Sequence, residues 1–158
     1  MGKDGRNHRL KGMLSLLIEH LYAQPCSLVV LKNGHVSTYF KKGVRDLIWL
    51  IDNQPDNLHG AMVADKVVGK AAAGLMIVGG VAEVYADVMS KPAILLFEEQ
   101  AIPYSYHQLV DAIEIPEGDT RCPLEQIVSK AHTAEEIEKL LRTHFIEMSI
   151  NNKTEKIK

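Results

Sequence analysis

The stretch GAMVADKVVGKAAAGLMIVGGVAEVYADVMSKPAILLFEEQAIPYSYH occupies residues 60–107 and decides the fold. It contains two short, mostly apolar runs and a third short run with two tyrosines, and two longer segments separate these runs. Short runs of this kind, bounded by turn residues or by a helical pattern, predict β-strands. The three predicted strands cover residues 60–64, 81–88 and 103–107.

The two longer segments between these runs predict helices. Residues 68–78 are rich in alanine, leucine and methionine. The pair Gly79-Gly80 then ends the segment, as glycine commonly does beyond a helix C-terminus. Residues 91–101 carry Pro92 near their start, where a missing N–H does no harm. The resulting order β-α-β-α-β, with short connections, predicts parallel strands joined by right-handed crossovers.

The N-terminal part of the chain predicts a helix, a hairpin and a second helix. Apolar residues recur near helical spacing over Leu10–Ala23. The runs Ser27–Leu31 and Val36–Phe40 flank the dipeptide Asn33-Gly34. Both residues of this dipeptide tolerate positive φ, so it favours a tight β-hairpin. Residues Val44–Asp52 then predict a short helix with an apolar face.

Two further helices are predicted near the C-terminus. Pro123–Ala131 forms the first, and Thr133 opens the second in a capping box with Glu136, through about Phe145. We expect one domain, because no linker, repeat or low-complexity segment interrupts the chain. The predicted domain spans residues 10–146, and the predicted flexible tails are residues 1–9 and 147–158.

Composition and charge narrow the classes of function. The chain has 158 residues, 46% apolar and 24% charged, which is an ordinary balance for one globular domain. Its net charge of −2 disfavours general nucleic-acid binding, although a local basic patch stays open. The apolar stretch Ala71–Ala82 is shorter than the roughly 20 residues that cross a bilayer. Two cysteines and no signal-peptide pattern suit a reducing compartment, so we expect a cytoplasmic protein without a membrane partner.

The predicted parallel sheet indicates where a ligand binds. Ligands of open α/β sheets lie outside the carboxyl ends of the strands, where helix N-termini point. Lysines beside such N-termini attract phosphate or carboxylate, and a serine there can donate to a ligand oxygen. We therefore predict a site for a phosphate-bearing small molecule. The candidate ligand-binding residues are Asp65, Lys66, Gly69, Lys70, Ser90 and Lys91.

A structural role for the same residues stays open. First-turn lysines are often only solvated, Asp65 can pair with a neighbouring lysine, and Ser90 can simply cap its helix. The pattern is also not a P-loop, because Ala64 and Ala71 stand where that motif needs glycine and a hydroxyl residue.

Three segments carry a resemblance to a known family: GAMVADKVVGKAAA at 60–73, EVYAD at 83–87 and CPLE at 122–125. On these the chain resembles an uncharacterised family of small prokaryotic proteins, over about residues 27–145. That family is similar in fold to the cytidine deaminases. The resemblance implies a three-layer α-β-α sandwich with a mixed sheet, in which the N-terminal hairpin precedes the β-α-β-α-β unit.

The residues argue against zinc-dependent deamination. Deaminases of this kind place His or Cys, followed by Glu, at one helix start and Pro-Cys-x-x-Cys at the next. Here the first predicted helix start has none of these, and the second keeps Pro92 but has Ala93 and Leu96 in place of the cysteines. Without three nitrogen or sulfur ligands there is no zinc-activated water. We therefore predict neither a metal nor a cofactor.

Two other functions stay open beside ligand binding. Cys122, before Pro123 at a predicted helix start, is a candidate nucleophile, because a helix N-terminus lowers a thiol pKa. Its alternative role is that of a small buried residue, with Glu125 as a capping side chain. The third function is a non-catalytic module for partner docking or homo-oligomerisation, which requires an exposed apolar patch.

Overall fold

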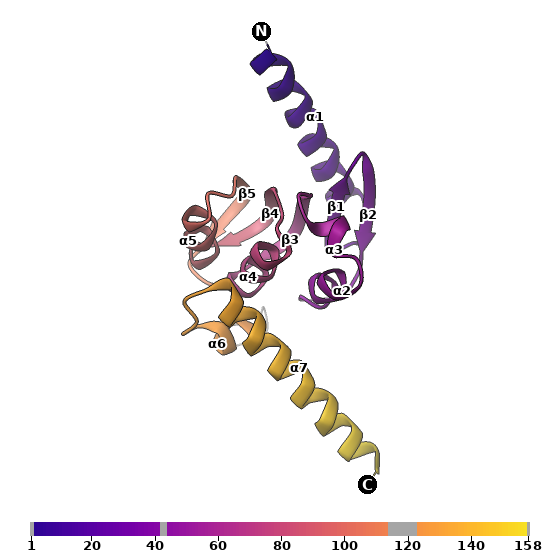
Figure 1. The fold of residues 1–158 in the computed structure, drawn as a ribbon, viewed down its shortest axis with the longest axis vertical. Coiled ribbons are helices and arrows are strands. Elements are labelled where there is room, and N and C mark those ends of the chain that lie inside the picture. Colours follow the sequence, from indigo (N-terminus) through magenta and orange to yellow (C-terminus); the bar gives the residue numbers. More distant parts are fainter. Residues whose placement is uncertain (1, 42–43, 114–122, 158) are drawn as a thin grey trace.

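A five-stranded mixed sheet forms the centre of the molecule (Figure 1). The computed structural model describes residues 2–41, 44–113 and 123–157. The strand order is β2-β1-β3-β4-β5, with β1 antiparallel to both neighbours and β3, β4 and β5 mutually parallel. The strands are β1 Leu28–Lys32, β2 His35–Tyr39, β3 Met62–Val68, β4 Glu83–Ser90 and β5 Tyr104–Val110. The predicted mixed sheet and its β-α-β-α-β unit are confirmed.

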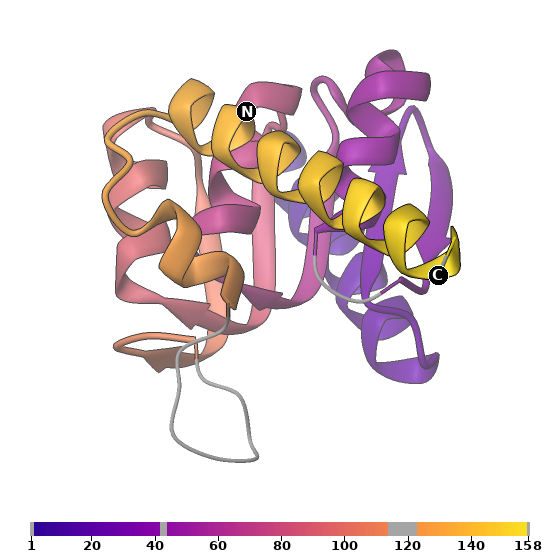
Figure 2. The same ribbon diagram turned by 90° about the horizontal axis from the view of Figure 1, so that it is seen from below.

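Helices cover both faces of the sheet, which gives the α-β-α layering. The helix α1 packs on β1 and β3 from one face. The other helices share a core with the opposite face, where α7 crosses and packs along α4 (Figure 2). The helices are α1 Gly2–Ala23, α2 Arg45–Asn53, α3 Pro55–Leu58, α4 Lys70–Gly79, α5 Lys91–Glu99, α6 Pro123–Val128 and α7 Ala134–Ile157.

The two faces of β1 separate the hydrophobic core into two clusters. Val29 and Leu31 pack with Leu17 and Leu21 of α1. Val30, between them in sequence, belongs to the larger cluster under the remaining helices. This alternation is the two-residue period of a strand that is covered on both faces. It explains why β1 is apolar at successive positions.

The predicted hairpin joins β1 and β2 through the two residues Asn33 and Gly34. Their φ angles are 52° and 79°, so both lie in the left-handed region, as a type I′ turn requires. Lys32 pairs with His35 across the turn. The hairpin prediction is confirmed, and the strands extend to Lys32 and His35, which leaves a two-residue loop.

Both terminal helices extend past the predicted domain. The helix α1 begins at Gly2 and α7 ends at Ile157, so residues 2–9 and 147–157, which were expected in tails, are helical in the structure. Figure 1 shows the outer ends of α1 and α7 projecting from opposite sides of the sheet. Within the described ranges, none of the helices has the length and apolar character needed to span a membrane.

The main correction to the predicted elements lies at the end of β3. The predicted strand ended at Ala64 and the next helix began at Val68. In the structure β3 continues to Val68, paired with β4, and α4 begins at Lys70. Parallel pairing satisfies the backbone groups of this segment and therefore outweighs its helical pattern. Asp65 and Lys66 consequently lie within a strand rather than at a helix N-terminus.

A glycine allows α4 and α7 to approach closely. Gly74 is buried on α4, and a Cβ added there would lie 2.6 Å from Cγ2 of Ile137 on α7. Ile137 is itself fully buried, so it has little room to move. Gly12, on α1, has no neighbouring atom within 4 Å of the corresponding position.

We expect Gly74→Ala to lower the free energy of unfolding by about 1–2 kcal/mol, because overpacking Ile137 outweighs the better helix propensity of alanine. The control Gly12→Ala adds the same methyl group to a helix without a clash, and should raise stability by up to about 1 kcal/mol. Urea denaturation of both variants checks this. A Gly74→Ala protein as stable as Gly12→Ala would show that the close approach is not required.

Candidate functional site

Several strands and helices converge on one edge of the sheet. The parallel strands β3, β4 and β5 all end there, and α4 and α5 begin there. The register pairs Leu28 with both Asp65 and Tyr39, which places the end of β2 at the same edge. The helix α2 therefore also starts on this side. Two cavities lined by described residues lie here, and α6 contributes a residue to each.

The first cavity lies at the N-termini of α4 and α5 and is called the inner cavity below. Its volume is about 220 Å³. It brings together predicted residues Lys70 and Ser90 with Glu125 and Ser129, from the α6 region. Asp111 and Ile113, which follow β5, also line it. The segments GAMVADKVVGKAAA and CPLE, far apart in sequence, therefore meet in space through Lys70 and Glu125.

Side chains of the protein already occupy most of the helix N–H groups at the inner cavity. The Glu125 carboxylate accepts hydrogen bonds from the N–H of Lys70 at 3.1 Å and of Ala71 at 3.3 Å. At α5, Ser90 Oγ accepts from the N–H of Ala93 at 3.3 Å, and Pro92 has no N–H. The N-terminus of α4 thus holds an anion that belongs to the chain itself.

Gly69 has a specific role in this arrangement. A Cβ added at Gly69 would lie 2.0 Å from Oε1 of Glu125 and 2.8 Å from Cγ1 of Ile113. The sequence predicts Gly69 as a ligand-binding residue. In the structure the group that approaches Gly69 is the Glu125 carboxylate.

The remaining predicted residues are dispersed. Asp65 is buried in β3, and Lys66 donates to the carbonyl of Gln24 at 3.4 Å, at the end of α1. Lys91 forms an exposed ion pair with Asp111, with 2.8 Å between Nζ and Oδ1. Of the three predicted lysines, only Lys70 is among the residues that line the inner cavity.

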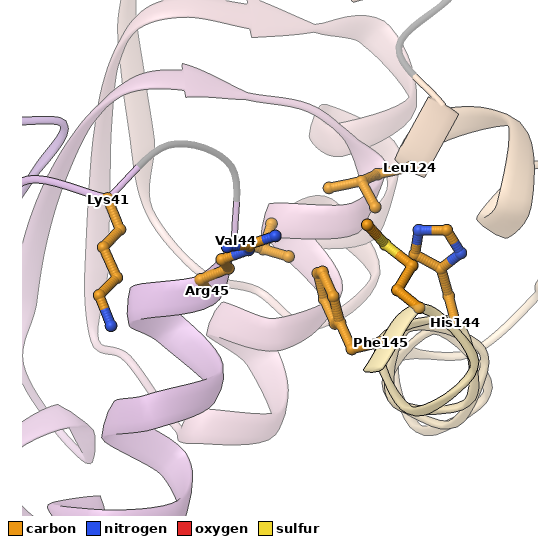
Figure 3. A pocket seen from close by; sticks show the side chains of 7 residues that line it. Lys41, Val44, Arg45, Leu124, His144 and Phe145 are labelled. Carbon is orange, nitrogen blue, oxygen red and sulfur yellow. The ribbon is translucent and has the colours of Figure 1, made fainter. Parts of the chain in front are cut away.

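The second cavity lies between α2, α6 and α7 and is called the basic cavity below (Figure 3). Its volume is about 560 Å³. Three of its lining residues are basic, and the other four are apolar. The basic residues are Lys41, Arg45 and His144, and the apolar residues are Val44, Leu124, Phe145 and Met148.

The charged groups of this cavity are not ion-paired within the part of the chain that the structure describes. The Arg45 guanidinium lies 5.8 Å from the centroid of the Phe145 ring, a cation–π contact. Among the residues that the structure describes, no carboxylate forms an ion pair with Lys41, Arg45 or His144. The cavity therefore presents positive charge beside an apolar surface.

Two sequence predictions concern metals and nucleophiles. In the described ranges, no group of three or more His, Cys, Asp or Glu side chains could hold a metal ion. Cys122, the candidate nucleophile, lies outside the described residues, and α6 begins at the next residue, Pro123. Its catalytic role stays a prediction.

Comparison with known proteins places the chain in a family. A family model described as a domain of unknown function, DUF1893, matches residues 16–145. The chain belongs to the DUF1893 family. This DUF1893 chain is also similar to the crystal structure of a DUF1893 family protein, TM1506, from Thermotoga maritima. The two are 28% identical, with a TM-score of 0.77, and the match covers 85% of this chain and 90% of that chain.

The comparisons confirm one expectation and leave another as a prediction. The resemblance to an uncharacterised family is confirmed by the DUF1893 match. No curated protein matches the sequence. The similarity in fold to the cytidine deaminases stays a prediction.

Two features of this DUF1893 chain escaped the sequence analysis. Glu125 was interpreted as a cap of its own helix, but its carboxylate lies on α4, and the bonded residues are 54 and 55 positions apart. No local signal marks such a pair. The basic cavity had a weak signal in Lys41 and Arg45, which lie close together before and at the start of a helix. Its other wall comes from α7, about 100 residues later.

Buried acids lie behind the same sheet edge. Asp65 is 6% exposed, and its Oδ1 accepts the N–H of Val67 at 3.2 Å. Burial raises the pKa of Asp65 from 3.8 to about 7, and the nearby charge of Asp46 adds to this rise. Asp46 is also buried, and it accepts the N–H of Lys41 at 2.9 Å.

We expect Asp65 to make this DUF1893 protein less stable as the pH rises. Between pH 3.8 and about 7 the folded state keeps a proton that the unfolded state has released. The free energy of unfolding therefore falls by up to about 1.4 kcal/mol per pH unit in that window. Asp65→Asn stays neutral and keeps an acceptor for Val67, so its advantage over wild type should grow from pH 5 to pH 8.

Urea denaturation at several pH values measures this difference. Asp56→Asn, an exposed acid of α3, is the control and should show no comparable growth. A constant difference between Asp65→Asn and wild type across the range would contradict the raised pKa.

Proposed function

We propose that this DUF1893 protein binds a small phosphate-bearing molecule with an apolar or aromatic body, such as a nucleotide, in the basic cavity. The observation that carries this proposal is the set of three bases, Lys41, Arg45 and His144, which have no ion-paired acid among the described residues and face an otherwise apolar lining.

The chemistry of the lining matches both parts of such a ligand. A guanidinium donates two parallel hydrogen bonds to a phosphate, and an ammonium group adds a compact positive charge. Phe145, Leu124 and Met148 offer apolar contacts to a ring or chain. The volume of about 560 Å³ falls within the roughly 300–1,000 Å³ that is typical of small-molecule sites.

The inner cavity is the alternative location for the phosphate, as predicted from the sequence. Its helix N–H donors are largely occupied by Glu125 and Ser90. The Lys70 ammonium donates to the carbonyl of Ser129 at 3.0 Å, and Lys91 is paired with Asp111. An anion entering there would have to displace these partners, so the geometry favours the basic cavity.

We expect adenosine and guanosine monophosphates to bind more tightly than adenosine, guanosine or inorganic phosphate, because only the nucleotides use both the bases and the apolar lining. Arg45→Ala and Lys41→Ala should each weaken nucleotide binding by roughly tenfold to a hundredfold, the effect of losing hydrogen bonds to a charged group. Isothermal titration calorimetry measures these affinities, with circular dichroism to verify folding.

Two matched lysine variants locate the site. Lys139→Ala removes an exposed charge from α7 outside both cavities and should leave the affinity unchanged. Lys70→Ala removes the ammonium group of the inner cavity but keeps the backbone N–H that binds Glu125, so it should weaken nucleotide binding far less than Arg45→Ala. Loss of binding in Lys70→Ala with normal binding in Arg45→Ala would move the ligand to the inner cavity. Failure of wild type to bind any of these probes would refute the proposal.

A further inference from the structure

The helix α6 contributes a residue to each of the two cavities. Leu124 lines the basic cavity, and the next residue, Glu125, lines the inner cavity. The helix α6 is six residues long, and it packs against α4 and α7. A helix this short gains little from its own hydrogen bonds, so its position is set by what it touches.

We propose that Glu125 is a positioning residue of the ligand site: its carboxylate, bound at the N-terminus of α4, fixes α6 and thereby holds Leu124 in the wall of the basic cavity. This inference rests on the function proposed above and identifies a residue on which that site depends without contact to the ligand.

Lys70 holds α6 from both ends. Its backbone N–H donates to Glu125 near the start of α6, and its ammonium donates to the carbonyl of Ser129, just after the end of α6. Gly69 allows the carboxylate this close, because a Cβ there would collide with Oε1 of Glu125. Three consecutive residues at the start of α4, from Gly69 to Ala71, therefore form the surface that α6 contacts.

Hydrogen bonds are directional, so they fix the orientation of α6, which apolar packing alone does not. Val128 is fully buried, and Leu124 and Ile127 are partly buried against the main core, so hydrophobic contact alone keeps α6 on the protein. Such contact is non-directional. The two hydrogen bonds of Glu125 specify the rotation of α6 about its axis and its position relative to α4. These two quantities decide whether Leu124 lines the basic cavity.

The electrostatics of Glu125 fit a held carboxylate. Burial raises the pKa of Glu125 above its usual range, whereas the N–H groups of Ala71 and Lys70 and the Lys70 ammonium oppose this rise. The positive end of the α4 dipole favours the same ionised state. Removal of the charge therefore weakens the contact that orients α6.

Hydrogen–deuterium exchange tests, without any ligand, whether Glu125 holds α6 in position. The N–H groups of Lys70 and Ala71 start a helix and have no intrahelical partner, so Glu125 is the acceptor that protects them. In Glu125→Gln we expect exchange at one of these amides and across α6 to increase by about tenfold. Glutamine is used because it has the same size as glutamate. Alanine would open space at the N-terminus of α4 and would admit anions there. Glu135→Gln, exposed on α7, is the control.

A double-mutant cycle tests the link to the ligand site. We expect Glu125→Gln and Leu124→Ala each to weaken binding of the nucleoside monophosphates by roughly threefold to tenfold, the range of coupled neighbours. If Glu125 acts through Leu124, the double variant should bind no more weakly than Leu124→Ala alone. A residue that only stabilises the fold would leave the affinity of the folded protein unchanged, and one that acts independently of Leu124 would give additive losses.

The outcomes separate this inference from the proposed function. Unchanged exchange in α6 of Glu125→Gln, or additive losses of affinity in the cycle, would overturn the role of Glu125 even if wild type binds nucleotide. Increased exchange in α6 of Glu125→Gln, together with no nucleotide binding by wild type, would overturn the proposed function. It would still support the inference that Glu125 holds α6 in position.

Discussion

The parallel pairing of β3, β4 and β5 is the constraint on which the rest of the structure depends. Parallel neighbours cannot be joined by a tight turn, so α4 and α5 must carry the chain back across one face. Both helices then begin at the same edge, where the strands end. The antiparallel position of β1 brings the end of β2, and with it the start of α2, to that edge as well. The candidate site is a consequence of this topology.

Several helix N-termini lie at one edge, and their backbone N–H groups need hydrogen-bond acceptors. Each helix start exposes N–H groups that need partners, and burial makes an unmet donor costly. The chain supplies Ser90, the residue just before α5, and Glu125 from a separate element, and Glu125 thereby binds α6 to α4. The same demand that makes such an edge attractive to anions is therefore used here for folding.

Local chemistry explains which features could be predicted from the sequence. The Asn33-Gly34 hairpin and the order of the central strands and helices follow from residues that are neighbours in sequence, and they are confirmed. The end of β3 was misplaced because pairing with β4 outweighed a local helical pattern. The acceptor of the Lys70 and Ala71 N–H groups and the basic cavity depend on segments separated by 54 residues or more, which periodicity cannot bring together.

The distribution of charge, rather than its total, bears on function. A net charge of −2 weighs against general nucleic-acid binding. It says nothing about three bases gathered in one cavity, because attraction in a partly enclosed site depends on the charges within several ångströms. Several acids of the chain are committed elsewhere: Asp65 is buried behind the edge, Glu125 is bound to α4, and Asp111 is paired with Lys91. A chain whose net charge is negative can therefore have a cavity whose basic side chains are available to an external anion.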